Sequence, residues 1–192
     1  MSVQERKQRE RADRERLIVA TARELAEQQG WDAVTTRLLA ERIEYSQPVL
    51  YSHFRGKREI IGAVALAGAT EMAVAVRAAT SSANSPRERV AALARAYLDF
   101  AARNPAVYDA IFQLDGGLAY AQEDTPEPLK DAFAALLETL GEVAGDGVHP
   151  GLFTETFWAA LHGIATLTRT ERLPPEYTEQ RVKLLVDRLA ML

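Results

Sequence analysis

The sequence predicts an all-α protein of about nine helices. Nearly every segment spaces its apolar residues three and four positions apart, as an amphipathic helix does. No run shows the sustained two-residue alternation of a half-buried strand. Ser85-Pro86 and Pro174-Pro175 are typical of helix starts, and Gly30 sits where a C-terminal cap belongs.

The N-terminal part divides into a charged arm and three helices. Residues 1–12 are highly charged, so we expect a frayed arm. A helix over 13–29 has an apolar face made of Ile18, Ala22, Leu25 and Ala26. Thr35 or Thr36 caps a second helix, and a three-residue turn leads to a third with Pro48 in its first turn.

The rest of the chain, residues 61–192, continues the helical pattern. Ser85 and Glu88 have the spacing of a capping box, and a Gly-rich acidic stretch over 115–125 is the longest expected loop. The remaining helices are expected near 57–77, 86–103, 105–112, 126–144, 150–170 and 174–192.

Composition favours a soluble, cytoplasmic protein with a sizeable core. Apolar residues make up 47% of the 192 residues, and there is no cysteine for a disulfide or a thiolate zinc site. The N-terminus lacks the apolar stretch of a signal peptide, and the apolar run 60–69 is too short to span a bilayer. The net charge is −4, yet residues 1–60 hold 12 Lys and Arg against 10 Asp and Glu. This asymmetry suggests two different tasks in the two parts.

The second and third helices have the lengths and the short turn of a helix-turn-helix. In such a unit the second helix enters the DNA major groove. Gln47 can pair with adenine, Arg37 with guanine or phosphate, and Val49 can contact a thymine methyl group. Three further donors suit phosphates: Tyr51, His53 and Lys57. Each of these residues could also be an ordinary solvated group, but the ordered set favours DNA binding.

The run Leu50-Tyr51-Ser52-His53-Phe54-Arg55-Gly56-Lys57 resembles the recognition region of the TetR-type (tetracycline-repressor-like) transcriptional regulators. Thr35-Thr36-Arg37 and Gln47-Pro48 also match the pattern of that family. The resemblance implies a helix-turn-helix DNA-binding domain over 13–60. It also implies DNA contacts by Thr36, Arg37, Gln47, Tyr51, His53 and Lys57. With the neighbouring Pro48 and Val49, these are the candidate DNA-binding residues.

Glu44 departs from the family pattern, which usually has glycine in this turn. If the position keeps a left-handed conformation, a residue with a Cβ costs about 1–2 kcal/mol there. The turn is then either reshaped or strained. The carboxylate also brings a negative charge close to where phosphates would lie.

The last two helices have the pattern of a dimer interface. The helix over 150–170 has two apolar sides, one of them with Trp158 and His162. The last helix carries a seam of Val182, Leu185, Leu189 and Leu192. Paired across two subunits, these helices would form a four-helix interface. The alternative is a single intramolecular core that uses every face.

Residues 158–163 also resemble the Trp…His-Gly (WHG) signature of a C-terminal domain found in one branch of the family. The resemblance implies a ligand-binding and dimerisation domain over 61–192 that takes small, mostly apolar molecules. The candidate pocket residues are Tyr97, Phe100, Tyr108, Phe112, Trp158 and His162. For each of them, plain core packing is the alternative.

We therefore expect a ligand-responsive transcriptional regulator. It would be a repressor that binds a palindromic operator as a homodimer and is released by a hydrophobic or aromatic inducer. A helical small-molecule-binding protein with a vestigial DNA-reading head is the alternative. With three histidines, no cysteine and no Gly-rich phosphate loop, we expect neither an enzyme nor a metal site or cofactor.

Overall fold

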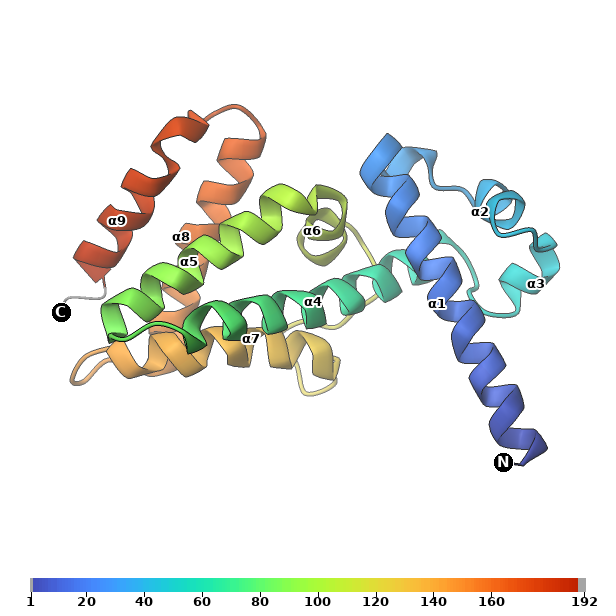
Figure 1. The fold of residues 1–192 in the computed structure, drawn as a ribbon, viewed down its shortest axis with the longest axis horizontal. Coiled ribbons are helices and arrows are strands. Elements are labelled where there is room, and N and C mark those ends of the chain that lie inside the picture. Colours follow the sequence, from blue (N-terminus) through green and yellow to red (C-terminus); the bar gives the residue numbers. More distant parts are fainter. Residues whose placement is uncertain (1, 190–192) are drawn as a thin grey trace. The chain divides into compact units, whose positions relative to one another are not determined.

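The structure, a computed structural model, describes residues 2–189 and is all-helical over them, as predicted (Figure 1). Short 3-10 turns lie at Trp31–Ala33, Gly141–Val143 and Pro175–Tyr177. The nine α-helices of this part of the chain are α1 (Val3–Gln29), α2 (Thr36–Arg42), α3 (Gln47–Tyr51), α4 (Lys57–Ser81), α5 (Pro86–Arg103), α6 (Pro105–Phe112), α7 (Glu127–Leu140), α8 (Pro150–Arg169) and α9 (Thr178–Leu189).

The chain forms two compact units. Unit 1 contains α1 to α3, the start of α4 up to Gly68, and the segment 104–126 with α6. Unit 2 contains the rest of α4 from Ala69, together with α5, α7, α8 and α9. The domain boundary near residue 60, expected from the sequence, stays a prediction.

Helix α1 begins ten residues earlier than the sequence suggested. The frayed arm expected over residues 1–12 is helical from Val3 on. Ser2 and Glu5 form a reciprocal capping box at its start, and Arg11 pairs with Glu15 at 2.9 Å one turn apart. These local interactions extend the helix without any apolar packing.

The core of unit 1 contains one or two residues from each short helix. Its fully buried side chains include Ile18, Leu25, Val34, Leu39 and Leu50. The Trp31 indole donates to the carbonyl of Ala106 at 2.8 Å, which ties the end of α1 to α6. The Glu27 carboxylate accepts hydrogen bonds from the first backbone amides of α6, so it serves as the N-terminal cap of that helix.

Helix α2 ends in a Schellman motif built on Glu44. The Tyr45 amide donates to the carbonyl of Ala40 at 2.9 Å, and the Glu44 amide donates to that of Glu41 at 3.3 Å. Glu44 has a φ of 57°, so the left-handed conformation of the turn is retained without glycine. The strained form of the turn, one of the two sequence-based alternatives, is therefore present.

Two glycines of α4 let the segment 104–126 approach closely inside unit 1. A Cβ built on Gly62 would lie 2.4 Å from the carbonyl oxygen of Gly116. A Cβ built on Gly68 would lie 2.1 Å from a methyl group of Val107. Both distances are too short for real atoms, so glycine is needed at each position.

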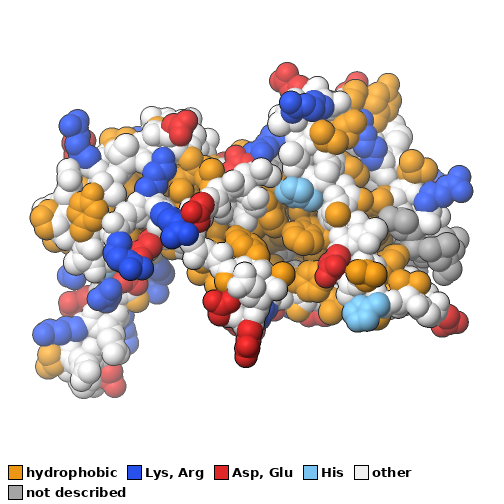
Figure 2. Space-filling view, turned by 180° about the vertical axis from the view of Figure 1, so that it is seen from behind, with side chains coloured by type: hydrophobic (Ala, Val, Ile, Leu, Met, Phe, Trp, Pro, Cys, Tyr) orange, Lys and Arg blue, Asp and Glu red, His pale blue; other side chains and the backbone are white. Residues whose placement is uncertain are grey.

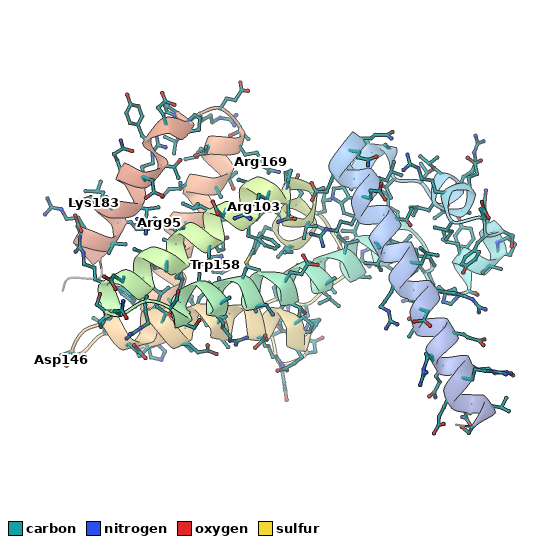
Figure 3. The ribbon with its side chains drawn as sticks, in the orientation of Figure 1. Arg95, Arg103, Asp146, Trp158, Arg169 and Lys183 are labelled. Atoms are coloured by element: carbon teal, nitrogen blue, oxygen red, sulfur yellow. The ribbon has the colours of Figure 1, made fainter. Side chains whose placement is uncertain are left out.

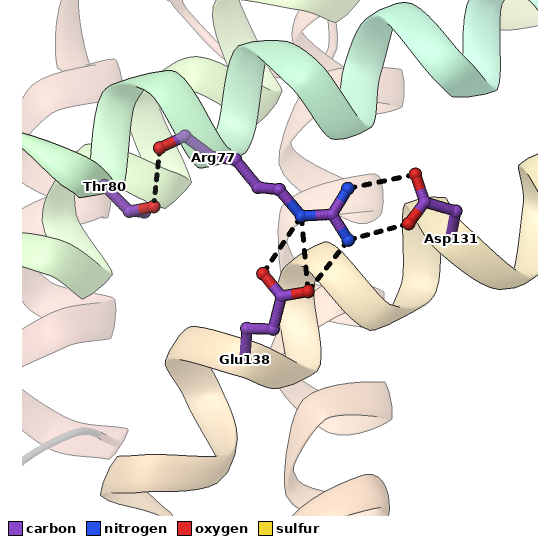
Figure 4. A network of polar contacts seen from close by, with 4 residues as sticks. All are labelled: Arg77, Thr80, Asp131 and Glu138. Atoms are coloured by element: carbon purple, nitrogen blue, oxygen red, sulfur yellow. Dashed lines mark hydrogen bonds and ion pairs between the residues drawn. The ribbon is translucent and has the colours of Figure 1, made fainter.

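Unit 2 is a helical core around α5, which packs against α7, α8 and α9. Tyr97, Leu140, Phe157 and Leu161 are fully buried there. Arg77 donates to both carboxylate oxygens of Asp131 at 2.7 and 2.9 Å and also to Glu138 (Figure 4). Hydrogen bonds from Arg77 hold the pKa of both carboxyl groups below their usual values.

The seam predicted on the last helix is partly used inside the subunit. Val182 is fully buried and Leu185 is half-buried, and α9 packs against α5. The heptad-like spacing reflects packing inside the subunit, because an intramolecular helix contact requires the same period as a dimer contact. The Leu189 side chain and Leu192 lie outside the described residues.

Helix α4 is the one described helix that is long and apolar enough to cross a membrane. Of its most apolar window, 56% is buried inside the protein. A buried apolar helix of this kind is typical of a protein core.

We predict that Glu44→Gly raises the free energy of unfolding by about 1 kcal/mol. Removing the Cβ relieves the left-handed strain, and the greater freedom of glycine in the unfolded chain offsets part of the gain. Urea denaturation measures the change. Glu44→Ala is the control, because it removes the charge and keeps the strain. An equal gain in both variants would assign the effect to the carboxylate instead.

Gly62→Ala should lower the free energy of unfolding by about 1–3 kcal/mol, because the new methyl group meets a backbone carbonyl that cannot rotate away. Gly163→Ala, inside α8 with nothing within 4 Å of its Cβ, is the control and should not destabilise the protein. Thermal denaturation of both variants is the measurement. Similar melting temperatures for the two would show that the close approach does not limit stability.

Candidate DNA interface and ligand-binding residues

Helix α3 is anchored by one buried side chain and exposes the others. Leu50 is fully buried, whereas Gln47, Pro48, Val49 and Tyr51 are exposed. Pro48 lies in the first turn, where its missing N–H costs nothing. The polar surface of α3 therefore faces solvent and is free to contact another molecule.

The start of α2 lies beside α3 and adds two side chains to this surface. The Thr36 hydroxyl is 3.2 Å from the Tyr51 hydroxyl, which links the two helices and orients the tyrosine ring. The Arg37 side chain is 78% exposed, and its Nε lies 3.3 Å from a carboxylate oxygen of Glu41 on the next turn. An exposed pair of this kind is weak, so the guanidinium can exchange partners.

His53 lies deeper than the sequence suggested. Its side chain is only 6% exposed, and Nδ1 is 3.2 Å from a carboxylate oxygen of Glu15 in α1. Burial raises the pKa of Glu15, but hydrogen bonds from His53 and Arg11 more than offset this and hold that pKa below its usual value. The histidine therefore ties the end of the recognition region to α1.

Lys57 is also engaged inside unit 1. Its ammonium group donates to the backbone carbonyl of Trp31, and the side chain is half-buried. An ammonium group has three donors, so two of them remain for another acceptor. The structure thus places Lys57 at a fixed position at the start of α4.

The six predicted ligand residues divide between the two units. Tyr108 and Phe112, on α6 of unit 1, pack with tilted rings whose centroids are 4.7 Å apart. In unit 2, Tyr97 is fully buried, and its hydroxyl accepts a hydrogen bond at 3.0 Å from the indole of Trp158, a residue labelled in Figure 3. Phe100 is also buried. A single pocket lined by all six residues stays a prediction.

His162, one turn after Trp158, is half-buried in unit 2. Burial lowers its pKa, and the nearby positive charge of Arg169 lowers it further. The imidazole is therefore neutral near pH 7 and suits a partly apolar surrounding. The described residues contain no group of three or more side chains placed to hold a metal ion.

One surface groove of unit 2 was missed by sequence reasoning. It has a volume of about 400 Å³ between α5 and α9, and none of the six predicted ligand residues lines it. Two ion pairs border it, Arg87 with Asp187 and Arg95 with Glu179. The two arginines are distant in the sequence from the two carboxylates, so no local pattern could have indicated the groove.

Comparison with known proteins assigns both parts of the chain to the same family. Residues 18–64 match the family model described as bacterial regulatory proteins, tetR family. Residues 90–189 match the model described as the tetracyclin repressor-like C-terminal domain. The finer assignment to the WHG branch stays a prediction.

The chain is also similar to individual proteins. An uncharacterized HTH-type transcriptional regulator of Bacillus subtilis is 33% identical over 101 residues, with 50% of each chain covered, so the match spans half of that relative. A regulator of the same type from Mycobacterium tuberculosis is 26% identical over 156 residues, covering 80% of this chain and 69% of the relative. A protein with unknown function from Rhodococcus sp. RHA1 has the same fold, with a TM-score of 0.76, 25% identity and coverage of 92% and 93%.

The family and the regulators among these relatives act in transcription and are not enzymes, in agreement with the expectation from the sequence. The two family models match the N-terminal helix-turn-helix and the C-terminal helical region in the order in which the structure arranges them. The chain therefore belongs to the TetR family of bacterial regulatory proteins.

Proposed function

We propose that the chain is a ligand-responsive repressor that binds double-stranded DNA through α2 and α3. One observation carries this proposal: α3 exposes Gln47, Val49 and Tyr51 around the buried anchor Leu50. A core helix would bury these side chains. A helix that enters a major groove needs them outside. As an intracellular regulator of DNA, the protein would act in the cytoplasm.

Specificity comes from the exposed side chains of α2 and α3. Gln47, in the first turn of α3, offers its amide to adenine, and Val49 offers a methyl surface to thymine. Arg37 reaches guanine or phosphate once it exchanges Glu41 for the DNA. Pro48 fixes the backbone between Gln47 and Val49 and so limits the entropy lost on binding.

Contacts to backbone phosphates fix the position of α3 along the DNA. Thr36 and Tyr51 lie together at the edge of the exposed surface, where the hydroxyl that accepts in their hydrogen bond keeps its own hydrogen for a phosphate. Lys57 contributes its two remaining donors. His53 is nearly buried, so at most its Nε2 atom can reach a phosphate at the edge of the exposed surface. Its other role is to position neighbouring groups through its contact with Glu15.

A palindromic operator requires two DNA-binding domains that are related by a two-fold axis and lie about 34–36 Å apart. The last two helices carry the exposed apolar side chains that a second copy would cover. Leu152 and Leu167 on α8 are 62% and 40% exposed, and Leu184 on α9 is 59% exposed. This outer face, and not the Val182 seam, is the part of the last two helices that we assign to the homodimer.

Unit 2 supplies a site for a hydrophobic or aromatic inducer. Tyr97, Trp158 and the neutral His162 combine aromatic surface with few charges. A ligand that favours a dimer with a different distance between its two DNA-binding domains weakens DNA binding. By thermodynamic linkage, bound DNA weakens ligand binding by the same factor. Native mass spectrometry of the purified protein would identify a ligand that copurifies with it.

The proposal is tested by fluorescence anisotropy with duplexes recovered by binding selection from a random-sequence pool. A DNA-binding regulator enriches a two-fold symmetric sequence and binds it as a dimer. A small-molecule-binding protein with a vestigial head enriches nothing and binds all duplexes equally weakly at low salt. Such a result would remove the DNA-binding role and leave the ligand-binding alternative.

We predict that Gln47→Ala costs about 1–3 kcal/mol of binding free energy at the base that Gln47 reads. Preference at that position should relax, while binding to random duplex stays unchanged, because the amide contacts a base edge and no phosphate. Anisotropy with the selected duplex and with each single-base variant measures this. Equal losses on selected and random duplexes would contradict the assigned role.

Lys57→Met should weaken binding to all sequences alike and flatten the salt dependence of log K by about one unit per subunit. Methionine retains the apolar stem of the side chain and removes only the charge. Since Lys57 also bonds to Trp31, circular dichroism must first show that the variant is folded. A folded variant with an unchanged salt dependence would exclude a phosphate contact.

A further inference from the structure

The first three turns of α1 extend beyond the other helices of unit 1. We call residues 3–14 the α1 extension. All of its side chains are exposed except Ala12, which is half-buried. Glu15, the next residue, contacts His53 just after α3, so the extension continues past the end of the recognition region. Figure 1 shows it as a helix that projects from the rest of unit 1, and Figure 2 shows this end of the chain as a narrow protrusion.

The α1 extension has no packing role that would explain it. It buries no apolar side chain, and its helix is maintained by the Ser2–Glu5 capping box and by ion pairs along its surface. Ordering the extension therefore gains almost nothing from the hydrophobic effect. A charged helix held in a defined direction suggests a partner outside the chain.

The α1 extension also holds most of the uncommitted positive charge of unit 1. Arg37, Arg55 and Arg58 pair with carboxylates, and Lys57 donates to a carbonyl. Among the described Lys and Arg of unit 1, the side chains without such a partner are Lys7, Arg9, Arg14 and Arg42. Three of the four lie in the extension, where they are available to an anionic partner.

Two of these cations lie on the face of α1 that is turned toward the rest of unit 1. Ile18, Ala22 and Leu25 are the buried stripe of α1. Counting back at about 100° per residue, Lys7, Arg11 and Arg14 continue the same stripe into the extension. Arg9 lies about 160° around the helix from Lys7, on the far side. The free cations at 7 and 14 thus face the side on which α3 lies.

We propose that Lys7 and Arg14 bind backbone phosphates of the DNA that flanks each half-site, which makes the α1 extension a second DNA-contacting element beside α3. Lys7 lies eight residues before Glu15, about 12 Å along the helix axis. A major groove is about 12 Å wide, so the α1 extension is long enough to span from the end of α3 to the next phosphate strand. This inference rests on the proposed DNA-binding function.

The α1 extension would add affinity without adding base preference, because contacts to phosphates carry no direct sequence information. Arg11 lies between Lys7 and Arg14 on the same stripe and is paired with Glu15 at 2.9 Å. This exposed pair is weak and does not cancel the charge of its neighbours. The four acidic residues of the first 16 limit the attraction to short range.

The test compares Lys7→Ala, Arg14→Ala and Arg9→Ala in the full chain. Each variant removes one cation from the α1 extension, and alanine retains the helix. The probe is a duplex from the binding selection, with about ten base pairs of added flank on each side. Lys7→Ala and Arg14→Ala should each weaken binding about three- to tenfold and lower the salt slope of log K by about two per dimer. Arg9→Ala should change neither quantity.

A duplex trimmed to the edges of the half-sites is the second probe, and on it all three variants should bind like the unaltered protein. The inference is overturned if the unaltered protein binds the flanked duplex and Lys7→Ala and Arg14→Ala bind it equally well. It is also overturned if Arg9→Ala is as weak as the other two, since the effect would then be one of net charge. If the unaltered protein binds no duplex, the proposed function fails, and this inference fails with it.

Discussion

The burial of Leu50 is the interaction on which the proposed DNA-reading surface depends. Helix α3 has five residues, and a helix of that length does not form by itself in water. Leu50 is fully buried in unit 1, as are Ile18 and Leu39. Tertiary packing therefore supplies the stability that local propensity lacks, and it leaves the remaining side chains of α3 on the outside.

Trp31 organises the polar contacts around this core. Its indole donates to Ala106, and its carbonyl accepts from Lys57, so a single residue connects α1, α4 and α6 within unit 1. Glu27 adds a second connection between α1 and α6, because its carboxylate caps α6. The start of α4 is thereby fixed with respect to α1. Two candidate phosphate ligands, His53 and Lys57, owe their positions to hydrogen bonds that also hold the unit together.

Turn chemistry shows how far local sequence can predict this structure. For Glu44 the sequence left two possibilities, a reshaped turn or a strained left-handed residue, and the structure has the left-handed one, with a φ of 57°. The same reasoning missed the start of α1. Residues 3–12 have no apolar period, and their helix begins with the Ser2–Glu5 capping box. Local hydrogen bonds, and not periodicity, produce this part of the helix.

Helix α9 shows what periodicity alone cannot predict. Spacings of three and four on α9 predict an apolar seam, and the seam exists, but Val182 packs inside unit 2. Periodicity identifies a face that needs a partner, and it contains no information on which helix that partner is. The outer residue Leu184 leaves more than half of its surface exposed, and the proposed dimer contact rests on residues of this kind.

The sequence by itself determined the all-helical class, most of the helix boundaries and the identity of the exposed polar set on α3, because caps, prolines and a period of 3.6 residues are local signals. Only the tertiary structure decided which donors are free. It buries His53 against Glu15 and anchors Lys57 on the carbonyl of Trp31. Pairing between residues distant in the chain depends on how the helices pack, and no local pattern encodes that geometry.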